Sequence, residues 1–212
     1  LWSIGRKDLD LKNISKVNRA QVFGDVASNP SRQQVVDMID DLLCFEEKSE
    51  VTVLDVGCHV GGMLAAIGRT FPGKVNRWGF DPEDSAIQQG AERHPHLTLR
   101  CGTAKDAQDG AFILPTFVDV LVANGVFSVI DVAAAEDLLT LAAAKARRIV
   151  IADDILNMDG PYPVFRDFGK YVLHPFRTML AQHGFAIESV SPAILPSRSI
   201  TGILVARNMR DR

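Results

Sequence analysis

The stretch Leu54-Asp55-Val56-Gly57-Cys58-His59-Val60-Gly61-Gly62 decides how this chain folds. It begins inside the β-rich apolar run 51–56, and three glycines crowd the turn that follows. Glycine lets a backbone turn tightly and approach a ligand at the start of a helix. A helical pattern over 63–70 comes next. Strand, glycine turn and helix together predict the first unit of an α/β domain.

Strand and helix patterns alternate on both sides of this stretch. A packed amphipathic helix is predicted from Asn29-Pro30 onward, because proline is favoured in the first helical turn. Further strands are expected over 75–80, 97–101, 117–124 and 148–153, and further helices over 82–93 and 133–146. The run 117–124 is apolar throughout, so both of its faces should be covered. This alternation predicts a parallel sheet with helices on both sides.

The last third of the chain has a different pattern. Residues 154–165 contain one glycine and two prolines and are expected to form a loop. A helix is expected over 168–183, closed by Gly184. The strands 186–191 and 199–207 follow with no helix between them, so they are expected to pair antiparallel. The sheet should therefore be mostly parallel, with seven strands and a C-terminal antiparallel hairpin.

Composition limits the domain organisation and the classes of partner. The 212 residues, 47% of them hydrophobic, suit one domain with a sizeable core. We expect an N-terminal helical cap or lid over 1–33, with a short helix at 15–23, and the main domain over 34–212. A net charge of −3 and the lack of a basic patch argue against nucleic acid as a partner. No apolar run reaches the roughly 20 residues that span a bilayer, so no membrane association is expected.

The cysteines indicate the compartment. There are three, and no two form a CxxC pair. An odd number in apolar surroundings favours reduced thiols in a cytoplasmic protein over a disulfide framework or a zinc site. No other cluster has metal-ligand spacing, so no metal is expected.

Polar residues end three of the predicted strands. In an open parallel sheet, ligands bind beyond the carboxyl ends of the strands. Asp55 lies in the first such end, and Asp81 ends the second strand 24 residues after Gly57, where an acid can accept hydrogen bonds from a ribose. The alternative is that Asp81 only caps the following helix. The third end, 102–106, either borders a base or is a plain turn.

The glycine turn matches neither common phosphate-binding pattern. It lacks the Gly-Lys-Ser/Thr of a nucleotide triphosphate loop, and His59 breaks the GxGxxG pattern of dinucleotide-binding proteins.

Four motifs in order resemble those of the class I S-adenosylmethionine-dependent methyltransferases. They are DVGCHVGG (55–62), GFDPEDSAI (79–87), CGTAKD (101–106) and FVDVLVANGVF (117–127). The resemblance covers about residues 35–207 and implies the Rossmann-like fold of that family. It also implies S-adenosylmethionine as cofactor and S-adenosylhomocysteine as product.

The resemblance assigns roles to residues of this chain. The methionine part of the cofactor would lie on the first-strand acid and the glycine loop, the ribose on the second-strand acid, and the adenine beside residues of the second and third strand ends. The floor near the sulfonium would come from the end of the fourth strand. The methionine part would thus contact Asp55, Gly57, Cys58, His59 and Gly61, and the ribose would contact Asp81. The adenine would lie beside Phe80, Pro82, Thr103 and Ala104, and the floor would be Asn124 and Gly125.

Two positions depart from the family pattern. His59 stands where the middle glycine is usual, and Thr103 where an acid is usual. His59 is expected to point outward from an ordinary backbone, or alternatively to contact the cofactor carboxylate. The physical chemistry agrees with the resemblance in one respect. An ammonium and a ribose explain two acids, Asp55 and Asp81, whereas a NAD enzyme requires only the second.

The expected reaction is a direct displacement that moves a methyl group to an oxygen or nitrogen of a small molecule. Alignment of the reactants and exclusion of water account for most of such catalysis. A general base is needed only where the acceptor carries a proton, and the candidates are His174, Asp154 and Tyr162. Each has a plainer alternative, as a surface helix residue, a loop cap and a packing residue respectively.

Other interpretations of the same sequence remain open. One is a methyltransferase-like module that binds a cofactor or partner without catalysis, and another is a NAD-binding oxidoreductase. A third is aminopropyl transfer on the same fold, which usually shows extra acids near the fourth strand. The acceptor and the oligomeric state are left open by the sequence.

Overall fold

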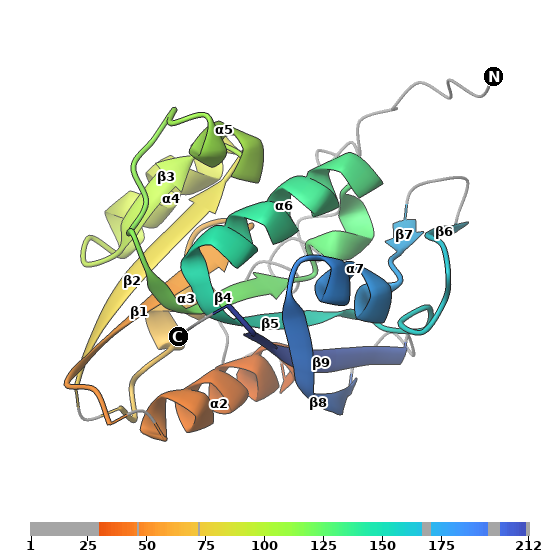
Figure 1. The fold of residues 1–212 in the computed structure, drawn as a ribbon. Coiled ribbons are helices and arrows are strands. Elements are labelled where there is room, and N and C mark those ends of the chain that lie inside the picture. Colours follow the sequence, from red (N-terminus) through yellow and green to blue (C-terminus); the bar gives the residue numbers. More distant parts are fainter. Residues whose placement is uncertain (1–29, 46, 72, 167–170, 195–199, 211–212) are drawn as a thin grey trace.

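A seven-stranded sheet lies between two layers of helices (Figure 1). The structure is a computed structural model and describes residues 30–45, 47–71, 73–166, 171–194 and 200–210. The strand order is β3-β2-β1-β4-β5-β9-β8. The strands are β1 (Glu50–Val56), β2 (Lys74–Asp81), β3 (Thr98–Cys101), β4 (Val118–Asn124), β5 (Ala146–Asp154), β8 (Phe185–Ile194) and β9 (Ile200–Asn208).

The first five strands pair in parallel, whereas β9 pairs antiparallel with both β5 and β8. The predicted fold class, a mostly parallel seven-stranded sheet finished by an antiparallel hairpin, is confirmed. The helices are α2 (Pro30–Cys44), α3 (Gly62–Ala66), α4 (Asp84–Arg93), α5 (Ala104–Gln108), α6 (Val132–Lys145) and α7 (Phe176–Gln182), with a 3₁₀ turn η3 (Phe127–Val129).

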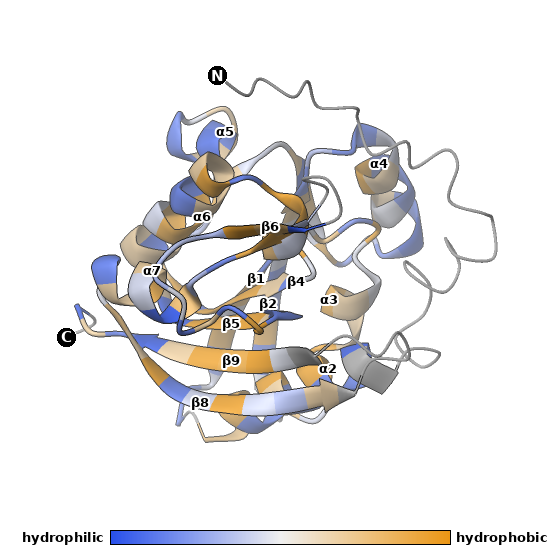
Figure 2. Ribbon diagram, turned by 90° about the vertical axis from the view of Figure 1, so that its right-hand side faces the viewer, coloured by the Kyte–Doolittle hydropathy of each residue, from blue (hydrophilic) through white to orange (hydrophobic). Residues whose placement is uncertain are grey.

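Alternate residues of the central strands face two separate cores. In β1, Val51 and Val53 pack with α2 and α3, while Leu54 and Val56 pack with α6 and α7. β4 is buried along almost its whole length, as its apolar sequence predicts. Figure 2 shows the hydrophobic colour concentrated in these strands.

Two predicted helices differ from the observed ones. The helix expected over 63–70 ends at Ala66, because Ile67 is already extended (φ −62°, ψ 139°) and Gly68 then turns the chain with a left-handed φ of 76°. The helix expected over 168–183 begins only at Phe176. The residue before a proline is driven toward extended backbone, and Pro175 follows directly on the strand β7 (Tyr171–Leu173) and His174.

β7 belongs to a second, two-stranded sheet that the sequence did not predict. Its partner β6 (Val164–Arg166) pairs with it antiparallel, so the expected loop 154–165 ends in a strand. Gly184 closes α7 with φ 85°, as predicted.

Hydrogen bonds to a buried carboxylate hold helix α2 against the main domain. Asp40 accepts hydrogen bonds from the backbone N–H of Gly68 at 2.6 Å and from the hydroxyl of Thr70 at 2.8 Å. The expected boundary between residues 33 and 34 falls inside α2. The rest of the expected cap, including the helix at 15–23, lies outside the described residues. No helix in the described part of the chain is long and apolar enough to cross a membrane.

Candidate functional site

The site forms where the order of the sheet reverses. After β1 the chain passes to β2 and β3 on one side, and then returns to β4 on the other. Neighbouring parallel strands that leave in opposite directions open a crevice at their carboxyl ends. Asp55 and the glycine turn, Asp81, and Asn124 all lie at this edge.

The glycine turn folds back onto the end of β2. The N–H groups of Gly57 and Cys58 both donate to the carbonyl of Phe80, at 2.9 and 3.2 Å. Gly57 has φ 70°, and a Cβ there would lie 2.7 Å from a methyl group of Val126. Glycine is therefore required at Gly57 both for its conformation and for its close approach to Val126.

His59 does not have the ordinary backbone expected of it. Its φ is 50°, and it is the one non-glycine residue with positive φ among those the structure describes. Its N–H donates to Oδ2 of Asp81 at 2.9 Å, so the left-handed conformation turns the amide toward that carboxylate. The imidazole is partly buried, and this burial lowers its pKa, although the negative charges of Asp81 and Glu83 act to raise it.

Asp81 joins two loops. Besides the bond from His59, its Oδ1 accepts the N–H of Glu83 at 2.9 Å. Helix α4 begins with Glu83 as its N-cap residue, and no side chain caps it. Asp81 therefore does not cap α4, and it stabilises the turn that leads into the helix.

Asp55 is a buried acid with an unusual proton affinity. Its side chain is 2% exposed, and this burial raises its pKa to about 8. The guanidinium of Arg32, on α2, acts in the opposite direction, whereas Asp81 raises the pKa further. Burial also lowers the pKa of Arg32. Sequence reasoning missed Arg32, because the pattern of α2 indicates only an amphipathic helix.

The residues expected near the adenine lie in different surroundings. The ring of Phe80 is 1% exposed and packs on Phe112, with their centroids 5.6 Å apart, so it belongs to the core. Pro82 is exposed, and Ala104 is buried. Thr103 caps α5: its hydroxyl lies 2.7 Å from Oδ2 of Asp106 and accepts the N–H of Asp106 at 3.2 Å. Cys58, in the glycine turn, is buried, and burial raises the pKa of its thiol.

Asn124 and Gly125 lie at the end of β4 beside the turn. The amide of Asn124 contacts the sulfur of Met63 at 3.6 Å, which joins β4 to α3. Gly125 donates to the carbonyl of Ala152 at 2.8 Å. A Cβ at Gly125 would meet nothing within 4 Å, so this position faces open space.

The three candidate bases are not joined to one another by any hydrogen bond or ion pair between their described side chains. His174 is 1% exposed and its Nε2 donates to the carbonyl of Phe127 at 2.9 Å, so it is neither on the surface nor in a helix. Burial lowers its pKa. Asp154 accepts the N–H of Leu156 at 3.0 Å, which is the loop-capping role given as its alternative. Tyr162 is 76% exposed.

Asp153 is a buried acid that holds the loop after β4. Its two carboxylate oxygens accept the N–H groups of Asp154 at 2.8 Å and Ser128 at 3.1 Å. Burial raises its pKa, and these hydrogen bonds oppose the shift. Asp153 thus positions η3, which follows Asn124 and Gly125 along the chain.

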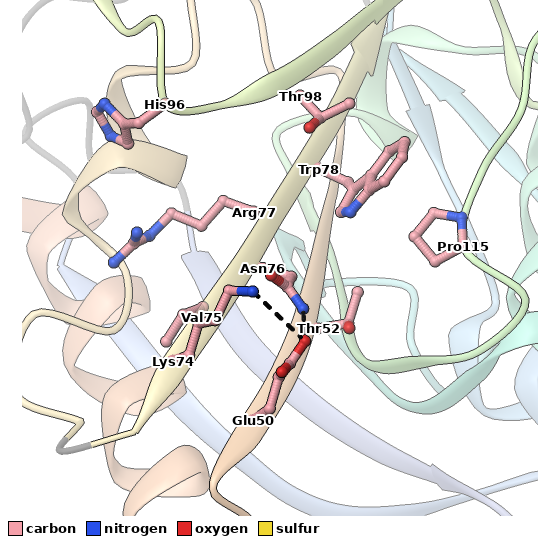
Figure 3. Close-up of a pocket in the computed structure, with 10 residues that line it drawn as sticks. All are labelled: Glu50, Thr52, Lys74, Val75, Asn76, Arg77, Trp78, His96, Thr98 and Pro115. Atoms are coloured by element: carbon pink, nitrogen blue, oxygen red, sulfur yellow. Dashed lines mark hydrogen bonds and ion pairs between the residues drawn. The ribbon is translucent and has the colours of Figure 1, made fainter.

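A groove of about 480 Å³ lies away from this site, at the amino ends of β1 and β2 (Figure 3). Trp78 and Pro115 line it beside an ion pair between Lys74 and Glu50 at 3.9 Å. It shares no residue with the crevice. Within the described ranges, no group of three or more His, Cys, Asp or Glu residues could hold a metal ion.

Comparison with known proteins identifies the fold. No protein-family model matches the sequence, and no curated protein is significantly similar to it. Among solved structures, magnesium protoporphyrin IX methyltransferase of Synechocystis PCC 6803 with bound S-adenosylhomocysteine has a TM-score of 0.64 at 17% identity, over 92% of this chain and 88% of that one. Geranyl diphosphate C-methyltransferase of Streptomyces coelicolor A3(2) has a TM-score of 0.62 at 14% identity, over 84% and 79%.

A third similar structure is a TehB-like S-adenosylmethionine-dependent methyltransferase of Corynebacterium glutamicum, with a TM-score of 0.60 at 17% identity, over 91% and 97% of the two chains. These likenesses show that the chain has the class I methyltransferase fold, as its motifs predict.

Proposed function

We propose that the protein is an S-adenosylmethionine-dependent methyltransferase that methylates an oxygen or nitrogen atom of a small molecule. The observation that carries this proposal is the pair of acids at adjacent strand ends, Asp55 and Asp81. They lie on the two sides of one glycine turn, and Asp81 is bonded directly to that turn through His59. The similar structures support the proposal, because two of them were solved with S-adenosylhomocysteine.

The charges at the crevice fit the methionine part of the cofactor. Asp55 is buried beside Arg32, and burial keeps the proton on its carboxyl up to about pH 8. An ammonium group placed against Asp55 would stabilise the carboxylate form, because an opposite charge nearby favours ionisation. Arg32 adds a positive charge near Asp55, which would also act on a carboxylate of the same ligand.

Asp81 fits the ribose. Each of its oxygens accepts one backbone N–H, and a carboxylate has about four lone-pair sites. Two sites are therefore open to the hydroxyls of a ribose. When bound, S-adenosylmethionine supplies a methyl group on a sulfonium, which is already electrophilic. The task of the chain is then to hold the acceptor in line and to exclude water.

We assign proton removal from the acceptor to Asp154 or Tyr162 in preference to His174. The ring of His174 is enclosed and its Nε2 is bonded to Phe127. Asp154 ends β5 at the edge of the crevice, and Tyr162 is exposed in the loop that follows it.

Calorimetric titration with S-adenosylmethionine, S-adenosylhomocysteine, NAD and NADP tests the proposal. We expect one site for each of the first two ligands and none for the nucleotides, with Asp55→Asn weakening both. Asp84→Ala is the matched control, because this exposed acid begins α4 close to the site. Binding of NAD in place of S-adenosylhomocysteine would show an oxidoreductase instead.

A further inference from the structure

The segment that follows β5 is fixed to the edge of the site. We call residues 155–166 and 171–173 the β6–β7 appendage, and Figure 1 shows its small sheet beside α7. Next to β7, His174 donates to the carbonyl of Phe127 at 2.9 Å, in the turn that follows Gly125. The amide of Asn157 donates to the carbonyls of Tyr162 at 2.8 Å and Leu173 at 2.9 Å, which ties the loop to β7.

The appendage carries exposed large hydrophobic side chains. Five of them are between 41% and 76% exposed, and Val129 on the adjoining η3 is 52% exposed. The five are Leu156, Tyr162, Val164, Phe165 and Tyr171. In the rest of the described chain such side chains lie on four separate segments, none with more than two of them, which is normal for a protein surface. Several large apolar groups on one short segment indicate a binding surface.

The described charged side chains around this surface form ion pairs with one another. In the described part of residues 154–177, Arg166 lies 3.9 Å from Asp154, and Arg177 lies 2.5 Å from Asp159. These four are all the Asp, Glu, Lys and Arg residues of that part. Among the described residues 154–166 and 171–177, every charged side chain thus has an oppositely charged partner, which favours an uncharged ligand over a charged one.

We propose that the β6–β7 appendage binds the body of the methyl acceptor, and that this acceptor is an uncharged molecule with a large apolar or aromatic part. The inference rests on the proposed function, since it names the substrate class of the same site. The appendage begins just after Asp154, where β5 ends at the carboxyl edge, and its strand β7 contacts η3, which follows Asn124 and Gly125 along the chain. Phe165 pairs with Val172 on β7, and β7 contacts η3, so the appendage adjoins the end of β4 through these two elements.

The neutral fluorescent probe N-phenyl-1-naphthylamine tests this surface, on protein saturated with S-adenosylhomocysteine. We expect saturable binding to the wild type, about tenfold weaker in Phe165→Ser and in Tyr162→Ser. Phe45→Ser and Ile113→Ser are matched controls, because these side chains are 87% and 80% exposed elsewhere on the molecule. Both controls should bind the probe within twofold of the wild type.

The related anionic probe 8-anilinonaphthalene-1-sulfonate should bind at least tenfold more weakly than the neutral one. Equal or tighter binding of the sulfonate, or equal losses in the controls, would overturn the inference. So would sedimentation showing a wild-type dimer that Phe165→Ser dissociates, since the surface would then join two copies. Titration of S-adenosylhomocysteine into the same samples separates the two proposals: its failure contradicts the proposed function, whereas normal titration with unchanged probe binding contradicts only the acceptor surface.

Discussion

The backbone N–H of His59 donates to Oδ2 of Asp81 at 2.9 Å, and this bond joins the glycine turn after β1 to the end of β2. Because Oδ1 of Asp81 also accepts the N–H of Glu83, one carboxylate fixes both loops of the candidate cofactor site. The side chain therefore has a structural role in addition to the proposed ribose contact.

Replacing Asp81 with alanine should weaken S-adenosylhomocysteine binding and also reduce stability. Hydrogen bonds to charged groups contribute about 1.5–3 kcal/mol, so the affinity should fall by roughly ten- to a hundredfold. The free energy of unfolding should fall by about 1–3 kcal/mol, because two backbone N–H groups lose their acceptor. Calorimetry and urea unfolding measure the two effects, with Asp84→Ala as control. Unchanged affinity in a folded Asp81→Ala protein would falsify the ribose role.

Replacing His59 with glycine should stabilise the protein. A left-handed conformation costs a non-glycine residue about 1–2 kcal/mol, and glycine adopts it freely. Glycine also makes the unfolded chain more flexible, which offsets part of this effect. We therefore expect the free energy of unfolding, measured in urea, to rise by about 1 kcal/mol. His96→Gly is the control, because its φ is negative and the same change there should destabilise. A loss of stability in His59→Gly would mean that contacts of the imidazole outweigh the backbone strain.

The buried carboxyl of Asp55 should make stability fall as pH rises. Its pKa is about 8 in the folded protein, because of burial, against about 4 in an unfolded chain. Between these two pKa values the folded state therefore binds more protons than the unfolded state. The stability that this proton contributes is complete below about pH 4 and is lost as pH rises toward 8. The slope reaches about −1.4 kcal/mol per pH unit. Unfolding of wild type and Asp55→Asn at pH 5 to 8 should show a difference that changes with this sign, and parallel curves would contradict it.

The same group should couple cofactor binding to proton release. An ammonium group can pair with Asp55 only after its carboxyl has lost the proton. Titration of S-adenosylhomocysteine at pH 7 in phosphate and in Tris should therefore differ in apparent enthalpy by the ionisation heat of nearly one proton. Asp55→Asn should show no such difference between buffers.

His174 should have the opposite effect on stability. Burial lowers its pKa in the folded protein, while an unfolded histidine titrates near 6.5. The unfolded state therefore binds more protons below about pH 6.5, and the contribution of neutral His174 is complete above that pH and lost as pH falls. His174→Phe lacks the hydrogen bond to the carbonyl of Phe127. At pH 8 its free energy of unfolding should therefore be about 1 kcal/mol lower than that of the wild type. This gap should shrink toward pH 5 in urea unfolding, and a constant gap would show that His174 does not titrate in this range.

The neighbouring acids Asp40 and Asp41 provide a matched pair on α2. Asp40 is buried and accepts two hydrogen bonds, whereas Asp41 is exposed. Asp40→Ala should lower the free energy of unfolding by about 2–3 kcal/mol, while Asp41→Ala should change it by less than about 0.5 kcal/mol. Equal effects in thermal or urea unfolding would mean that α2 is not held by this carboxylate.

The sequence predicted the sheet well because strand and helix periods were clear around the central strands. The fully apolar run of β4 and the helix-free link before β9 correctly indicated the covered strand and the antiparallel finish. It failed at 171–173, where a short strand takes the place of the expected helix and Pro175 sets the start of α7; residues 168–170 lie outside the described part of the chain.

The positions of Asp55 and Asp81 at the carboxyl ends of adjacent strands were predictable, because each lies in a local motif. Arg32 was not, because its position beside Asp55 depends on how α2 packs against the sheet. The burial of His174 and the left-handed backbone of His59 also follow from tertiary contacts that no spacing reveals.

Strand β8 is one of the two edges of the sheet, and an edge strand can recruit strands from other molecules. Its register shifts at an irregularity between Ile187 and Ser189, and Pro192 has no N–H to donate. An incoming strand would therefore meet uneven spacing and a missing donor within a few residues. This edge is therefore poorly suited to accepting a further strand, so the antiparallel finish also gives the sheet a boundary on this side.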